Sequence, residues 1–381
     1  MAYFDNAATS YPKPNEVYDF MDQFYREHGG SPGRGNHSMA GTAKQITHET
    51  RLLLKDLLHC PAKQVVFTPT ATIAMNMILQ GMVAKGVRNI YISPFEHNAV
   101  TRTLCHYEKL GQISVTELPV SAGFTYDMER MRYQFDSLRP DLVIVSHASN
   151  VIGLLAPVED IFALAKRYGA VTLIDMAQTA GVVDINVGLE TIDYAVFAGH
   201  KTLLGPTGIS GFLMQPDLDL QPVLFGGTGY DSANQDMPHS IPERFEMGTI
   251  NISGIAGLNA ALRWIKTRTV TWLGREETKR REQLLELLGS YDYLSVVGNI
   301  EGNAYVGIVS CLMDGISSES AGGVFAERNI AVRAGLQCAP RAHQFLGTYP
   351  TGTIRFSVNA LTDDKDLAEL KYALDDIEMY L

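Results

Sequence analysis

The chain has 381 residues, of which 46% are hydrophobic and 19% charged, as in an ordinary globular protein with a large core. Its formal net charge of −11 argues against nonspecific binding to nucleic acid, because a phosphate backbone attracts a basic surface. No apolar run reaches the ~18 residues of a membrane helix, and the N-terminal segment lacks the basic start and apolar stretch of a signal peptide.

The four cysteines, at positions 60, 105, 311 and 338, are scattered along the chain without CxxC spacing. Such scattered cysteines predict neither a disulfide framework nor a structural zinc site. We therefore expect a soluble, reduced, cytoplasmic protein that holds no metal.

After an N-terminal arm that ends at residue 14, short apolar runs alternate with helical patterns. The runs are rich in β-forming residues and apolar on both faces, which is typical of buried parallel strands. The alternation predicts an α/β domain with a mostly parallel sheet, whose ligands bind beyond the carboxyl ends of the strands. Strands are predicted at residues 65–67, 89–93, 142–146, 171–175 and 194–197, and helices at 43–58, 73–84, 99–110 and 158–168.

From about residue 256 the pattern changes. A long, largely helical stretch over 255–288 leads into strands at 305–312 and 353–358 and a final helix at 366–379. This order indicates a smaller α+β domain packed beside the N-terminal arm. We expect residues 15–255 to form the large domain, and residues 1–14 with 256–381 to form the small one.

One lysine and one aspartate carry most of the functional signal. Lys201 follows a predicted buried strand and His200, and it precedes the turn-forming loop 205–208. Asp175 ends another apolar strand 26 positions earlier. Alone, Lys201 would be read as a solvated side chain and Asp175 as a helix cap. Together they predict a pyridoxal phosphate (PLP) enzyme, which needs an amine for a Schiff base and a carboxylate for the pyridinium nitrogen.

Residues that follow other strands, or lie close to Asp175, add to this prediction. The amides of Ala71 and Thr72, with the Thr72 hydroxyl, can cradle a phosphate at a helix N-terminus. Gln178 can reach the phenolic oxygen of the ring, and His97 can stack on the ring. Asn150 can bond the ring oxygen or a substrate carboxylate. Thr72 alone would be read as a helix cap and His97 as an exposed loop residue, so their weight comes from the set.

A second stretch points to the substrate. Cys338 lies in a loop with glycine, glutamine and proline, where a thiol is accessible, although a lone cysteine is more often a small buried hydrophobe. Arg355, on a predicted strand, offers the planar fork that suits an amino acid's carboxylate, its alternative being a surface ion pair.

The whole set resembles the class V aminotransferase family, and specifically its cysteine desulfurase and selenocysteine lyase branch. The resemblance runs from Phe4-Asp-Asn-Ala-Ala8 through the Lys201 motif and the Arg333 to Cys338 loop to Arg355. It implies an aspartate aminotransferase-like fold (PLP fold type I) and a homodimer with active sites at the interface. There Thr249 would reach the PLP phosphate of the partner subunit. The short spacing from Cys338 to Arg355 resembles the group II enzymes.

The resemblance implies conversion of L-cysteine to L-alanine, with the sulfur kept as a persulfide on Cys338. Lys201 would be the base, with His97 beside the ring, and Arg355, Arg333 and Asn150 would bind the substrate. A sulfur-acceptor protein, such as an iron–sulfur scaffold or a sulfur carrier, would receive the sulfur. The alternatives are a selenocysteine lyase, an aminotransferase without sulfur transfer, or a cofactor-free α/β binding module.

The sequence departs from the family pattern at two places. Ala198 stands where many relatives have a phosphate-binding serine, so that contact is left to His200 or to backbone amides. Leu336-Gln337 replaces the histidine pair that often precedes the cysteine in group II. The pattern therefore leaves open how the thiol is activated and whether sulfur or selenium is preferred.

Overall fold

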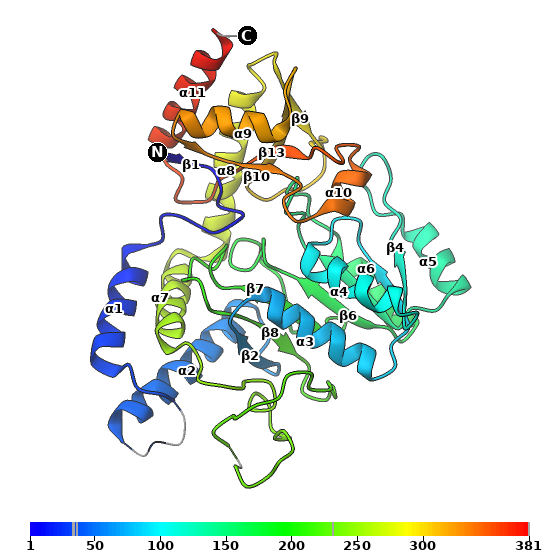
Figure 1. Ribbon diagram of the computed structural model, residues 1–381, viewed down its shortest axis with the longest axis vertical. Helices are drawn as coiled ribbons and strands as arrows, with labels where there is room; N and C mark the ends of the chain where they lie inside the picture. The colour runs from blue at the N-terminus through cyan, green and yellow to red at the C-terminus, as the bar shows by residue number, and fades with distance from the viewer. Residues whose placement is uncertain (33–34, 36, 231, 380–381) are drawn as a thin grey trace.

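The computed structural model describes residues 1–32, 35, 37–230 and 232–379, and its centre is a seven-stranded sheet (Figure 1). The strand order is β2-β8-β7-β6-β5-β3-β4. The strands are β2 (Gln64–Thr68), β3 (Asn89–Ile92), β4 (Ser114–Glu117), β5 (Leu142–Ser146), β6 (Val171–Asp175), β7 (Tyr194–Ala198) and β8 (Ser210–Met214).

The strand directions confirm the predicted mostly parallel sheet. Only β8 runs antiparallel to its neighbours, β2 and β7, and the other adjacent strands are parallel. Because β8 is reversed between them, β2 and β7 point the same way. All five strands predicted from the sequence therefore end at one edge of the sheet, where their following loops meet.

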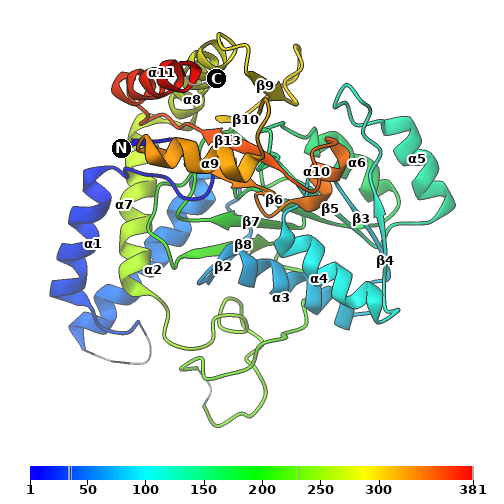
Figure 2. The same cartoon turned by 45° about the horizontal axis from the view of Figure 1, so that its top comes forward.

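Helices cover both faces of this sheet, which explains why its strands are apolar on both faces. Along β5, Val143 and Val145 face one core cluster while Leu142 and Ile144 face the other, as the two-residue period of a strand requires. The second cluster includes residues of α3 and α4, which lie against one face of the sheet (Figure 2). The helices of this part are α1 (Asn15–His28), α2 (Ser38–Leu57), α3 (Ala71–Ala84), α4 (Asn98–Lys109), α5 (Met128–Ser137), α6 (Val158–Arg167) and α7 (Ile252–Arg268).

A smaller antiparallel sheet, in the order β12-β13-β10-β9, forms the C-terminal part. It has its own core cluster, which includes residues of α8, α9 and α11. The N-terminal strand β1 (Ala2–Tyr3) pairs with β11 (Ile330–Ala331), so the arm lies beside this part (Figure 1). The remaining elements are α8 (Val270–Leu288), β9 (Leu294–Val297), β10 (Ile308–Met313), α9 (Ser318–Glu327), β12 (Arg333–Gly335), α10 (Pro340–Phe345), β13 (Thr353–Ser357) and α11 (Asp364–Glu378). Because the two parts have separate cores, we propose a division into the same two domains. Residues of α7, such as Leu258 and Leu262, belong to the core of the large sheet, so we place the boundary near Thr269, where α7 ends.

The structure differs from the sequence prediction at several element boundaries. The helical stretch 255–288 is divided into α7 and α8 at Thr269, whose φ of 76° interrupts the helix and whose side chain caps α8. The predicted strand 305–312 begins only at Ile308. The last helix starts two residues early, because Asp363 and Asp366 form a capping box. Among the described residues, none of the helices combines the length and apolar character needed to cross a membrane.

Candidate active site

The loops at the carboxyl edge of the large sheet surround a cavity of about 270 Å³. Strands β12 and β13 of the small sheet complete its wall, so the cavity lies between the two sheets. All of the predicted site residues except Thr249 and Cys338 line it: Ala71, Thr72, His97, Asn150, Asp175, Gln178, His200, Lys201, Arg333 and Arg355.

Lys201 and Asp175 reach this cavity because β6 and β7 are adjacent parallel strands that end together. Burial lowers the pKa of Lys201 to about 8, against the opposing effect of the Asp175 carboxylate. Burial raises the pKa of Asp175, whereas the Ala177 amide, 2.9 Å from its Oδ1, and the charge of Lys201 lower it. The pair therefore places a readily deprotonated amine near a carboxylate in a largely enclosed space.

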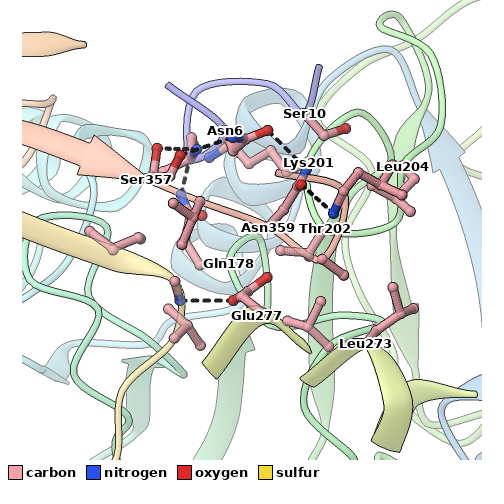
Figure 3. Close-up of a pocket in the computed structure, with 18 residues that line it drawn as sticks. Asn6, Ser10, Gln178, Lys201, Thr202, Leu204, Leu273, Glu277, Ser357 and Asn359 are labelled. Atoms are coloured by element: carbon pink, nitrogen blue, oxygen red, sulfur yellow. Dashed lines mark hydrogen bonds between the residues drawn. The ribbon is translucent and has the colours of Figure 1, made fainter. Parts of the chain in front are cut away.

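Lys201 also borders a second cavity, of about 20 Å³, which shares Ala7 and Gln178 with the first (Figure 3). Figure 3 shows Lys201 near Asn359 and Thr202, while the Glu277 carboxylate, in the lower part of the view, accepts a hydrogen bond from the Gly307 amide at 2.8 Å. Burial raises the pKa of Glu277 to about 7. This cavity has room for about one water molecule and is too small for a cofactor, so the larger cavity is the candidate site for a ligand.

Two histidines in the cavity are neutral at physiological pH. Burial and the charge of Lys201 lower the pKa values of His97 and His200 to about 4. His97 Nδ1 accepts a hydrogen bond from the Ala99 amide at 3.0 Å, so its Nε2 carries the proton. His200 Nδ1 is buried and has no hydrogen-bond partner among the described residues. His97 thus offers a neutral ring, and His200 an unused polar atom.

The N-terminus of α3 also borders the cavity. Thr70 caps the helix by accepting a hydrogen bond from the Ile73 amide at 3.2 Å, and Ala71 and Thr72 begin its first turn. First-turn amides have no acceptor within a helix and attract an anion. Ala198 also lines the cavity but brings no hydroxyl group.

Two arginines form the wall that belongs to the small sheet. Arg333 on β12 lies directly opposite Arg355 on β13 in the antiparallel register. Arg355 is 1% exposed; its Nη2 donates to Asp5 at 2.8 Å, its Nη1 to the Asn150 carbonyl at 2.9 Å, and its Nε has no partner among the described residues. Like charges on adjacent strands are unfavourable unless an anion is shared, so this wall suits a carboxylate.

Cys338 lies at the rim of the cavity rather than in its lining. It borders a neighbouring groove along α3 and α4, which shares Thr72 and His97 with the cavity. Its Sγ is 3.3 Å from Nη2 of Arg333. Gln337 and Cys338 have φ values of 41° and 60°, a left-handed conformation that costs a residue other than glycine about 1–3 kcal/mol. The surrounding structure must therefore hold this loop in place.

Thr249 does not join these residues within one chain. It is exposed and borders a different cavity, of about 700 Å³, beside Arg51 and Glu246. The role inferred for it, at the cofactor of a partner subunit, stays a prediction.

Three residues near the site were missed by sequence reasoning. Asp5 pairs with Arg355, and it lies in the motif on which the family resemblance rests. Glu96 is buried and accepts hydrogen bonds from the Ser146 amide at 2.6 Å and from Ser93 at 2.7 Å, so it links the ends of β3 and β5 and fixes the start of the His97 loop. Gln337 lines the cavity. No local pattern marks Glu96, because its partners come from two strands.

The fold and this cavity define an α/β enzyme of the PLP-dependent fold type I. The sequence model of the Aminotransferase class-V family matches residues 2–370, so the chain belongs to that family. It is 27% identical over 381 residues to a probable cysteine desulfurase of Methanothermobacter thermautotrophicus, a match that covers 98% of this chain and 94% of that protein.

Solved structures of similar chains have the same fold. The apo cysteine desulfurase of Thermococcus onnurineus matches with a TM-score of 0.89 and 26% identity, over 100% of this chain and 95% of that one. The cysteine desulfurase CsdA of Escherichia coli, solved in an S-sulfonic acid form, matches with a TM-score of 0.83 and 25% identity, over 100% and 95% of the two chains.

Proposed function

We propose that the chain is a PLP-dependent cysteine desulfurase, which converts L-cysteine to L-alanine and keeps the sulfur as a persulfide on Cys338. The observation that carries this proposal is the placement of three groups around one cavity. Lys201 and Asp175 line it, and the Cys338 thiol lies at its rim against Arg333. An aminotransferase has no use for the thiol, whereas sulfur transfer needs a nucleophile at the edge of the site.

The residues present fit PLP. Lys201 would form the Schiff base, Asp175 would bond the ring nitrogen, and the amides of Ala71 and Thr72 would hold the phosphate. The unpartnered Nδ1 of His200 is available for a further polar contact where Ala198 offers none. When bound, PLP supplies an electron sink that lets the substrate's Cα lose its proton.

The two opposed arginines would bind the substrate carboxylate. Arg355 is pre-oriented by Asp5 and by the Asn150 carbonyl, and its free Nε remains available for an additional hydrogen bond. A buried guanidinium fixes a carboxylate in one orientation because its donors form a planar fork. The side chain of the bound cysteine would then extend toward the rim, where Cys338 lies.

Lys201 Nζ would accept the α-proton, since a pKa of about 8 leaves about a tenth of the amine neutral at pH 7, far more than for a lysine of ordinary pKa. The Cys338 thiolate would attack the substrate sulfur. A sulfur–sulfur bond forms while the bond from Cβ to sulfur breaks, and the electron pair of that bond stays on carbon and is protonated. Enzyme thiol and cysteine thus give enzyme persulfide and alanine, with no external oxidant or reductant.

The proposal implies partners. A second copy of the chain would bring its Thr249 to the phosphate, and a thiol-bearing acceptor protein would take the sulfur from Cys338. The exposure of Thr249 and the position of Cys338 beside an outer groove support these roles.

Product analysis tests the activity. The holoenzyme is supplied with L-cysteine, or with selenocysteine in a parallel reaction, and alanine, sulfide or selenide, and the mass of the Cys338 peptide are measured. We expect one alanine per sulfur released and a mass increase of one sulfur atom on that peptide. Alanine formed only from selenocysteine would favour a selenocysteine lyase, and amino-group transfer to pyruvate would favour an aminotransferase.

The pH dependence of cofactor capture gives an independent check on Lys201. The neutral amine is the nucleophile, so the rate at which apoprotein binds PLP covalently should rise with pH and level off above about 8, the pKa of Lys201. Because the Asp175 carboxylate raises this pKa, the midpoint in Asp175→Asn should move to lower pH. Stopped-flow absorbance measures both profiles, and a midpoint that moves to higher pH in the variant would contradict the assignment.

A further inference from the structure

The backbone of the cysteine loop is held by a buried side-chain network centred on Gln337 and His343. Gln337 is 3% exposed and precedes Cys338 directly. Its Oε1 is 2.8 Å from Nε2 of His343, a residue of α10 that is fully buried. Its Nε2 is 2.8 Å from the Thr353 carbonyl and 3.3 Å from the Arg333 carbonyl.

These contacts fix the direction of each hydrogen bond. Two carbonyl groups face the nitrogen of the Gln337 amide, so its oxygen must be the atom that faces His343. His343 therefore donates from Nε2, and its Nδ1 accepts from the Thr348 hydroxyl at 2.7 Å. Burial lowers the pKa of His343 to about 4, so the ring is neutral and this tautomer persists across the physiological range.

The network connects the loop to both walls of the cavity. The Gln337 carbonyl accepts a hydrogen bond from Nδ2 of Asn150 at 2.6 Å, and the Cys338 carbonyl accepts one from the Asn98 amide at 2.7 Å. Asn150 lies in the loop after β5 and Asn98 begins α4, both in the large part, whereas Thr353 lies on β13 of the small sheet. Hydrogen bonds to both parts of the chain therefore hold Gln337 and Cys338, the two residues with a left-handed backbone.

Resting on the desulfurase function proposed above, we infer that Gln337 and His343 are positioning residues that lock the cysteine loop with the Cys338 thiol against Arg333. A group that attacks the substrate sulfur must meet it in a narrow range of geometry, and a small displacement costs a large part of the rate. Gln337 occupies the position at which the sequence departs from the histidine that often precedes the cysteine. Here it orients the thiol through the backbone, and His343 supports it from the next helix.

The test separates the two halves of the reaction. His343→Leu removes the nearer donor to Gln337 Oε1 and leaves only the Thr353 hydroxyl at 3.3 Å, and Gln337→Met removes the acceptor. In either variant we expect persulfide formation on Cys338 to fall by ~10–100-fold. The exchange of the α-proton of L-alanine in D2O, which needs Lys201 but not Cys338, should stay within about twofold. The double variant should be no slower than the slower single variant, because both substitutions break one link.

Two further variants distinguish positioning from a general loss of stability. His343→Gln restores a side-chain donor and should recover most of the persulfide rate. Leu374→Ala truncates a residue of the C-terminal core cluster, which contains neither Gln337 nor His343, and should lower the melting temperature without separating the two half-reactions.

Hydrogen–deuterium exchange of the holoenzyme tests, without any turnover, whether Gln337 and His343 hold the backbone of the cysteine loop. The peptide that covers residues 336–346 should exchange faster in His343→Leu than in the wild type or in His343→Gln. Unchanged exchange, a persulfide rate equal to that of the wild type, or an equal loss of both half-reactions would overturn the inference. If the wild type forms no persulfide, the proposed function fails, and the exchange result alone decides whether the loop is locked by these residues.

Discussion

Lys201→Ala is expected to abolish both covalent cofactor binding and turnover. The wild-type holoenzyme should absorb near ~420 nm because the lysine Schiff base is conjugated with the ring, and borohydride should bleach this band. The variant should lack the band, and its turnover should fall by at least ~10⁴-fold, because the same amine anchors the cofactor and moves the α-proton. Absorbance and alanine release measure the two effects.

Lys63 provides a matched control for this experiment. It is also buried with its pKa lowered to about 8, but it directly precedes β2 and so lies at the amino edge of the sheet. Lys63→Ala should keep the absorbance band. A lysine of lowered pKa can form the Schiff base with PLP only if it lies at the carboxyl edge of the sheet, where the cavity is. An intact band in Lys201→Ala together with its loss in Lys63→Ala would reject the assignment.

Cys338→Ala is expected to separate cofactor chemistry from sulfur transfer. The variant should keep the absorbance band and the α-proton exchange of L-alanine, because the thiol only borders the cavity. Its persulfide should disappear, and alanine release from L-cysteine should fall by ~100-fold or more, the scale expected when a positioned nucleophile is removed. Mass spectrometry of the protein after one turnover measures the persulfide.

Cys105→Ala is the control, because Cys105 on α4 is also partly exposed but belongs to no part of the site. It should form the persulfide at the wild-type rate. With selenocysteine, Cys338→Ala should retain more activity than with cysteine, since selenium leaves carbon more readily than sulfur. Full desulfuration of L-cysteine by Cys338→Ala would show that no persulfide on this residue is needed.

Much of the large sheet could be read from the sequence because its strands are buried on both faces. Such strands leave continuous apolar runs, as in β5 and β7, and the polar residue at the end of each run marks the edge where ligands bind. The positions of Asp175 and Lys201 in one cavity follow from this rule once β6 and β7 are adjacent. Strand β8 was not predicted, although it is as long and as buried as β5 and β7, because it directly follows a glycine-rich loop.

The remaining boundaries were set by packing or capping. The break at Thr269 allows α7 to pack on α1 and α2 while α8 belongs to the C-terminal core, and no proline or glycine marks it in the sequence. The start of α11 depends on a capping box. Local patterns are weak at such points because the deciding contact is either distant or made by a single side chain.

The amino-acid sequence by itself determined which chemical groups are present at the ends of which strands, and hence the class of chemistry. Only the tertiary structure decided how those groups are held. The partner of Arg355 is Asp5, 350 positions away, and Gln337 meets His343 across a turn that neither residue's local pattern predicts. The physical reason is that hydrophobic periodicity depends on residues close together in the sequence, so the sequence shows it directly. The direction of a buried polar side chain depends instead on the hydrogen-bond partners that the folded chain brings to it.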